Sequence, residues 1–135
     1  MLNVKKTLTK ILKQEAGTLQ ILKGTAGPGT RCIRNGNVVE FFIDLSGLTY
    51  TNGWNAVAQL PSGWEPANYY DFACLNTATD ESASAKVSSA GEIQIYKSSY
   101  VGAKMRLHSM HLVKWGGVIK NLFSAISYRK GVAVC

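Results

Sequence analysis

The sequence predicts an all-β fold: an antiparallel jelly roll or β-sandwich with a short N-terminal helix and a C-terminal extension. Apolar and polar residues alternate along short segments, turn signals separate these segments, and no helix-spaced segment lies between them. The 135 residues, 46% of them apolar and 17% charged, suit one globular domain. We expect a β domain over residues 17–113, between an N-terminal segment of residues 1–16 and an extension of residues 114–135.

Residues 2–14 predict a short helix with one apolar stripe. Its members Val4, Leu8 and Ile11 are four and three positions apart, which is heptad spacing, and the lysines lie mostly off the stripe. A lone helix of this length is marginal in water, so the stripe needs a partner. Two partners remain open: the β domain of the same subunit, or a neck in which several copies bundle.

The strongest strand signal is a hairpin around Asn35-Gly36. This dipeptide lies between strand candidates at residues 30–34 and 37–45 and predicts a type I′ turn. One face of the second strand should meet the core, and it carries Val39, Phe41, Ile43 and Leu45. The other candidates are residues 18–23, 56–60, 69–76, 83–88, 92–96 and 104–113, with a linker or loop at residues 24–29.

Residues 52–66, NGWNAVAQLPSGWEP, join two turns through a short apolar strand. In Leu60-Pro61-Ser62-Gly63 proline is second and glycine fourth, which favours a type I turn. The stretch contains no catalytic constellation, so it describes a scaffold.

The C-terminal extension has two open interpretations. Its apolar side chains suit an amphipathic helix or an added strand, and they are Val118, Ile119, Leu122, Phe123 and Ile126. The segment either wraps a neighbouring subunit or other component, or closes the core of its own subunit.

Charge and cysteine placement narrow the class of protein. The formal net charge is +7, but four lysines crowd the first segment and the other cations are scattered, so no nucleic-acid partner is expected. The cysteines Cys32, Cys74 and Cys135 are widely spaced and predict free thiols in a protein made in a cytosol. No apolar run approaches the ~20 residues of a membrane span, so no membrane insertion is expected.

The order of these motifs resembles the small structural proteins of tailed bacteriophages, and more closely the jelly-roll head domains of receptor-binding and fibre-type proteins in phages of Gram-positive bacteria. The resemblance covers residues 35–113 and the leader VKKTLTKIL. In the domain it is carried by Gly53, Trp54, Leu60, Pro61, Gly63, Trp64, Pro66, Gly91, Ile93 and Ile95. Family members often have an arginine where this chain has Glu65, so no binding role is carried over to that position.

The resemblance implies a homotrimeric virion protein, assembled in the bacterial host cytoplasm, whose leaders bundle or attach to other virion proteins. It implies adhesion to a host-surface saccharide through a tail or baseplate module. One alternative is a capsid decoration or head-fibre protein. A second is a cellular lectin or small carbohydrate-active enzyme.

Candidate chemistry is sparse in the sequence. His108 and His111 point to opposite faces of a strand because their separation is odd, so they cannot jointly hold one metal ion. Asp80 and Glu81 lie in a polar loop, and nothing brings together two carboxylates as a glycosidase requires. We expect no enzymatic activity, no cofactor and no metal site.

Aromatic residues in or beside loops are the better candidates for ligand binding. Flat rings with a polar edge stack on sugar faces and form hydrogen bonds at the rim. The candidates are Tyr50, Trp54, Tyr69 and Tyr70. For Trp54 a packing role remains open, and for Trp64, in the turn motif, packing is the favoured role.

Overall fold

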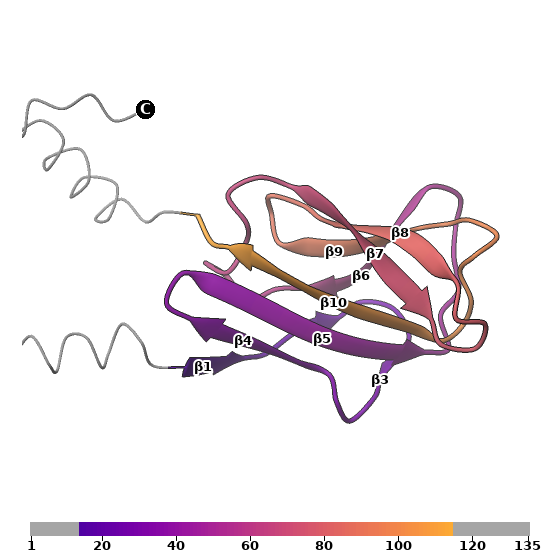
Figure 1. Ribbon diagram of the computed structural model, residues 1–135, viewed down its shortest axis with the longest axis horizontal. Coiled ribbons are helices and arrows are strands. Elements are labelled where there is room, and N and C mark those ends of the chain that lie inside the picture. Colours follow the sequence, from indigo (N-terminus) through magenta and orange to yellow (C-terminus); the bar gives the residue numbers. More distant parts are fainter. Residues whose placement is uncertain (1–13, 115–135) are drawn as a thin grey trace, which may run out of the picture.

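The computed structural model describes residues 14–114, which form ten β-strands and no helix (Figure 1). The strands are β1 (Gln14–Gly17), β2 (Gln20–Ile21), β3 (Thr25–Ala26), β4 (Arg31–Asn35), β5 (Val38–Ser46), β6 (Trp54–Gln59), β7 (Tyr70–Asn76), β8 (Ser82–Val87), β9 (Glu92–Tyr96) and β10 (Met105–Leu112). Their pairings are antiparallel, so the all-β antiparallel prediction is confirmed for these residues.

The N-terminal boundary of the β domain differs from the prediction. Gln14, which the sequence assigned to the end of a helix, begins β1 and pairs with Asn35 of β4. The β domain therefore includes residues 14–16. The proposed oligomerisation stripe of Val4, Leu8 and Ile11, and the extension after Lys114, lie outside the described residues.

The strands form one sheet that curls into a half-barrel. Hydrogen bonds connect them in the order β1-β4-β5-β10-β7-β8-β9-β6-β2, and β3 pairs with β5 off this path. The two ends of the path, β1 and β2, are consecutive in the chain, with only Thr18 and Leu19 between them. The chain thus holds the two edges of the curled sheet next to each other.

Three strand pairs nest inside one another along the chain. β7 pairs with β8, β6 with β9, and β5 with β10. This is the pairing of one long antiparallel hairpin that has been rolled up. The meander β7-β8-β9 and the return of β10 to the side of β7 also give the spatial order of a Greek key.

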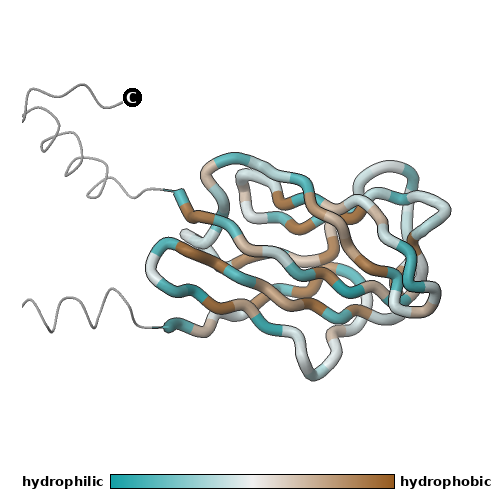
Figure 2. The backbone as a smooth tube through the Cα atoms, viewed as in Figure 1, coloured by the Kyte–Doolittle hydropathy of each residue, from teal (hydrophilic) through white to brown (hydrophobic). Residues whose placement is uncertain are grey.

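The inner face of the curl holds the core. Figure 2 shows hydrophobic and hydrophilic residues alternating along the strands. In β5 the predicted inner face is confirmed, since Val39, Phe41, Ile43 and Leu45 are buried. Their counterparts from the other strands include Val57, Val87, Ile93, Ile95, Met105 and Leu107. Burying each such side chain fully stabilises the folded state by ~1.5–3 kcal/mol, and the sum of these contributions determines which face of each strand turns inward.

The β4–β5 hairpin forms where predicted, but its turn is shifted by one residue. Asn35 pairs with Val38, so the loop is Gly36-Asn37. Gly36 has a φ of 60°, whereas Asn37 is not among the residues with positive φ. A positive φ at the first loop position only is the pattern of a type II′ turn, so the type I′ prediction is wrong.

The turn after β6 is displaced in the same way. The N–H of Trp64 donates to the carbonyl of Pro61 at 3.1 Å, so the turn places Gly63 third. Gly63 has a φ of 86°, as a type II turn requires there, and the type I prediction is wrong. The turn buries Trp64 against Gly17, where an added Cβ would lie 2.6 Å from the indole ring.

Candidate functional site

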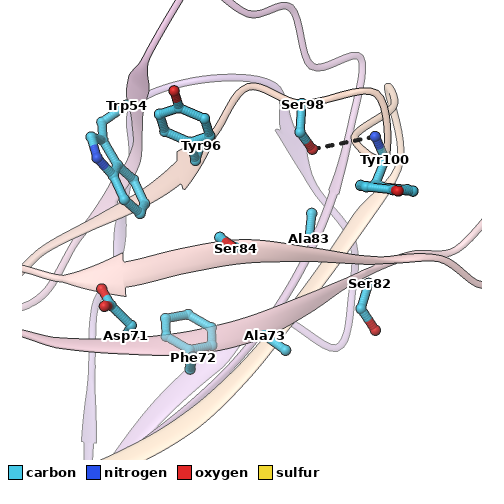
Figure 3. Close-up of a pocket in the computed structure, with 10 residues that line it drawn as sticks. All are labelled: Trp54, Asp71, Phe72, Ala73, Ser82, Ala83, Ser84, Tyr96, Ser98 and Tyr100. Carbon is cyan, nitrogen blue, oxygen red and sulfur yellow. Dashed lines mark hydrogen bonds between the residues drawn. The ribbon is translucent and has the colours of Figure 1, made fainter.

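An open groove of about 640 Å³ runs along the outer face of β7 and β8 (Figure 3). Its size is within the usual range of ligand sites. In Figure 3 one wall comes from β6, β9 and the β9–β10 loop, and the opposite side comes from β7. The lining residues are Trp54, Asp71, Phe72, Ala73, Ser82, Ala83, Ser84, Tyr96, Ser98 and Tyr100.

Trp54 stands at one end of the groove with 39% of its surface exposed. The ring of Tyr96, directly opposite on β9, meets it edge to face with the centroids 5.2 Å apart. The ammonium of Lys86 lies 4.2 Å from the centroid of the Trp54 ring, a contact that contributes about 0.5–1 kcal/mol at exposed sites. Both contacts restrain the indole before any ligand arrives, which lowers the entropy lost on binding.

The buried amide of Asn55 fixes the loop in front of Trp54. Its Nδ2 donates to the carbonyls of Thr51 and Gly53 at 2.9 and 3.0 Å. Its Oδ1 accepts the N–H of Thr51 at 2.8 Å and the ammonium of Lys23 at 3.1 Å. Because a buried polar group is costly to leave unpaired, these bonds favour one loop conformation.

Two side chains hold the β9–β10 loop, which carries Tyr100, through hydrogen bonds to its backbone carbonyls. Asn76 Nδ2 donates to the carbonyl of Tyr100 at 3.1 Å, and the Tyr50 hydroxyl donates to the carbonyl of Gly102 at 2.7 Å. Gly102 lies so close to Asn76 that an added Cβ would be 2.8 Å from Nδ2. The loop is therefore seated tightly while Tyr100, 51% exposed, lines the groove.

Hydroxyl groups and one carboxylate complete the lining. Ser98 Oγ accepts the N–H of Tyr100 at 3.3 Å (Figure 3), and Ser82 and Ser84 line the groove from β8. Asp71 faces Lys86 in the β7–β8 register, yet within residues 14–114 its carboxylate has no hydrogen bond or ion pair. The groove thus presents flat rings beside an unpaired acceptor and several hydroxyls.

Of the four residues that the sequence nominates for ligand binding, the structure places only Trp54 in the groove. Tyr50 is half-buried behind the β9–β10 loop, and burial raises the pKa of its hydroxyl to about 12. Tyr70 is half-buried against Phe72, while Tyr69 is 68% exposed and outside the groove lining. The four side chains do not form one site.

The two histidines lie on opposite faces of β10, as predicted. His108 is exposed and stacks on Phe42, with the ring centroids 4.3 Å apart. His111 faces inward, where its Nε2 lies 2.7 Å from the carbonyl of Trp64 and its Nδ1 lies 2.9 Å from the Tyr70 hydroxyl. A carbonyl only accepts, so Nε2 carries the proton and, in the neutral ring, Nδ1 accepts from Tyr70. Burial lowers the pKa of His111.

Sequence reasoning missed most of the groove. Tyr96 ends an alternating strand on its polar face, and Tyr100 sits in a serine-rich loop, so both carried the same signal as the nominated aromatics. Asn55 and Asn76 carried none, because nothing in the sequence marks a strand asparagine as buried. Lys86 is one of many cations scattered along the sequence, so nothing in its surroundings predicted a contact with Trp54.

The β9–β10 loop, which lines one end of the groove with Tyr100, and the chain ends lie at opposite ends of the domain (Figure 1). Residues 14 and 114 lie next to the β4–β5 turn, where Gln14 pairs with Asn35 and the N–H of Val113 donates to Asn37. The β9–β10 loop with Tyr100 lies at the far end. The fold therefore places the Tyr100 end of the groove far from residues 14 and 114.

Searches for related proteins found no family model that matches the chain and no curated protein with a similar sequence. Within residues 14–114, no three metal-ligating side chains gather in one place. The described part of the chain has no helix long and apolar enough to cross a membrane.

Proposed function

We propose that the protein is a non-enzymatic adhesion module that binds a saccharide in the groove between Trp54 and Tyr100. The observation that carries this proposal is the set of three exposed rings, Trp54, Tyr96 and Tyr100, beside serine hydroxyls and a carboxylate. Aromatic rings pack on the apolar faces of sugars, and hydroxyl and carboxylate oxygens pair with sugar hydroxyls. The restrained orientation of Trp54 suits such packing.

Binding without hydrolysis fits the lining of the groove better than catalysis does. A glycosidase places two carboxyl groups about 5–10 Å apart around the scissile bond. Asp71 is the one carboxylate among the residues that line the groove. A second acid would have to come from outside the lining.

The distance of the β9–β10 loop from residues 14 and 114 supports an adhesion module on a virion. Such a module is attached at one end and must expose its binding surface at the other. Here residues 14 and 114 lie at one end, and the β9–β10 loop, which contains Tyr100, lies at the opposite end. We therefore place the protein at a phage tail or baseplate, attached through its N-terminal segment.

The finer architecture that we propose is a jelly roll that assembles as a homotrimer. The nested pairs β5–β10, β6–β9 and β7–β8 and the Greek key support the jelly roll, an architecture of viral capsid and lectin domains. The heptad spacing of Val4, Leu8 and Ile11 supports self-association, and the resemblance to phage fibre proteins favours three copies over two.

A glycan array with the full-length chain tests the saccharide proposal. We expect binding to at least one bacterial surface saccharide, with Trp54→Ala and Tyr100→Ala each weakening it about tenfold or more. Tyr69→Ala is the matched control, since it removes an exposed ring outside the groove. A wild-type protein that binds no saccharide, or equal losses in all three variants, would contradict the proposal.

Light scattering coupled to size exclusion tests the trimer. The full chain should have the mass of three copies, and deletion of residues 1–13, which leaves β1 intact, should yield a folded monomer. A full chain that is monomeric, or a trimer that survives the deletion, would refute the neck.

A further inference from the structure

We infer that the groove selects neutral or amine-bearing saccharides over acidic ones, and that Asp71 is the residue that determines this selectivity. The inference rests on the proposed saccharide binding and adds the chemical class of the ligand. It follows from the charges that line the groove.

The residues that line the groove carry a charge opposite to that of the whole chain. The sequence carries a formal net charge of +7, which would attract acidic polymers in general. The lining, however, contains no lysine, arginine or histidine, and its one charged residue is Asp71. An acidic sugar bound beside Asp71 would meet a like charge.

Lys86, the cation opposite Asp71 in the β7–β8 register, lies against the Trp54 end of the groove and does not pair with the carboxylate. Its ammonium sits over the ring of Trp54. The two charged groups do not form an ion pair, so the carboxylate is available to a ligand.

An unpaired carboxylate defines which groups it can bind. It only accepts hydrogen bonds, so it suits the hydroxyl pairs of a neutral sugar, the N–H of an acetamido group or the ammonium of an amino sugar. The hydroxyls of Ser82, Ser84 and Ser98 accept or donate and do not discriminate by charge. Discrimination therefore falls on Asp71.

Measurements at two salt concentrations distinguish binding inside the groove from long-range attraction between the net charge of the chain and an acidic polymer. Attraction between the net charge of the chain and an acidic polymer is screened within about 8 Å at physiological ionic strength and is weaker still in higher salt. Packing of a neutral sugar on Trp54 and Tyr100 does not depend on net charge. Preference measured in high salt thus reports the groove.

The experiment compares neutral, amine-bearing and acidic glycans of matched length on one array, with the full-length chain, in low and high salt. In high salt, wild-type protein should bind its best neutral or amine-bearing glycan at least tenfold more tightly than the carboxylated or sulfated counterpart. Asp71→Asn should reduce this ratio about tenfold, and Asp71→Lys should favour acidic glycans.

Asp80→Asn is the matched control, because it removes the same charge from an exposed turn outside the lining and asparagine tolerates the positive φ of that position. It should leave the ratio unchanged. Preference of the wild type for acidic glycans in high salt, or an unchanged ratio in Asp71→Asn, overturns the inference while saccharide binding stands. Failure to bind any glycan overturns both.

Discussion

The buried amide of Asn76 couples two loops. Its Nδ2 donates to the carbonyl of Tyr100 at 3.1 Å, and its Oδ1 accepts the N–H of Ala78 at 3.0 Å. Asn76 is the last residue of β7, so one side chain joins the β7–β8 turn to the wall of the groove.

Asn76→Ala should therefore lower stability and loosen the Tyr100 loop together. Loss of the amide removes two part-buried hydrogen bonds, each of which contributes about 0.5–1.5 kcal/mol, so the variant should lose about 1–3 kcal/mol of stability. Chemical denaturation measures the loss, and hydrogen exchange should accelerate at Ala78 and in the β9–β10 loop. Asn52→Ala, which removes an exposed amide whose one side-chain hydrogen bond within residues 14–114 is to Lys97, should change stability by less than about 0.5 kcal/mol. Equal effects in the two variants would contradict the coupling.

Tyr50→Phe tests the second support of the same loop. Removing the hydroxyl that donates to Gly102 should cost about 0.5–1.5 kcal/mol. The pKa of Tyr50 is raised from 10.0 to about 12, so its contribution is present below pH 10 and is lost as the pH rises toward 12. Denaturation at pH 8 and pH 11 should show a smaller difference between wild type and variant at pH 11. A difference that does not change with pH would argue against this role.

Gly17→Ala should destabilise the protein by overpacking. The new Cβ would lie 2.6 Å from the Trp64 ring and 2.9 Å from the Pro61 ring, which forces a shift that costs about 1–3 kcal/mol. Gly29→Ala is the control, since its Cβ would meet only Asp44 Oδ2 at 3.8 Å. Thermal unfolding measures both variants, and equal melting temperatures would show that the Trp64 turn moves without cost.

The interior position of His111 predicts a pH dependence of stability. Its pKa in the folded state is lowered from 6.5 by burial, so at intermediate pH the unfolded chain binds more protons. The contribution of neutral His111 to the free energy of unfolding is therefore fully present above about pH 6.5. It is lost as the pH falls from 6.5 toward the lower pKa of the folded state. Protonation would also remove the acceptor that Nδ1 offers to Tyr70.

His111→Gln should remove this contribution. Stability of wild type and variant measured from pH 8 to pH 5 should fall more steeply in the wild type. Parallel curves would show that His111 does not contribute to the pH dependence.

The strands were predictable because burial on one face imposes a period of two. Val39, Phe41, Ile43 and Leu45 all turn inward, and the alternation needs no knowledge of distant residues. The turns were less predictable, because a shift of one residue depends on which backbone groups pair. Asn35-Gly36 and Leu60-Pro61-Ser62-Gly63 both marked a turn correctly, but each turn begins one residue later than predicted.

The groove was less predictable because it depends on strand order. Trp54 and Tyr96 are distant in sequence and meet only because β6 pairs with β9. Trp64 and Trp54 have similar sequence surroundings, yet one is buried by its turn and the other begins a strand on the outer face. Local composition did not distinguish them.

The nested strand pairs have a consequence for how fast the domain folds. The β7–β8 pair encloses only residues 77–81, and once it forms, the effective loop between β6 and β9 is shorter, as is then the loop between β5 and β10. Each strand pair that forms lowers the loop-closure entropy lost when the next, outer pair forms. Strands that are distant in sequence therefore pair without closing one long loop in a single step. We expect strand pairing to begin at the β7–β8 turn and to proceed to the outer pairs, and we expect β1 to pair with β4 at the edge of the sheet late in folding.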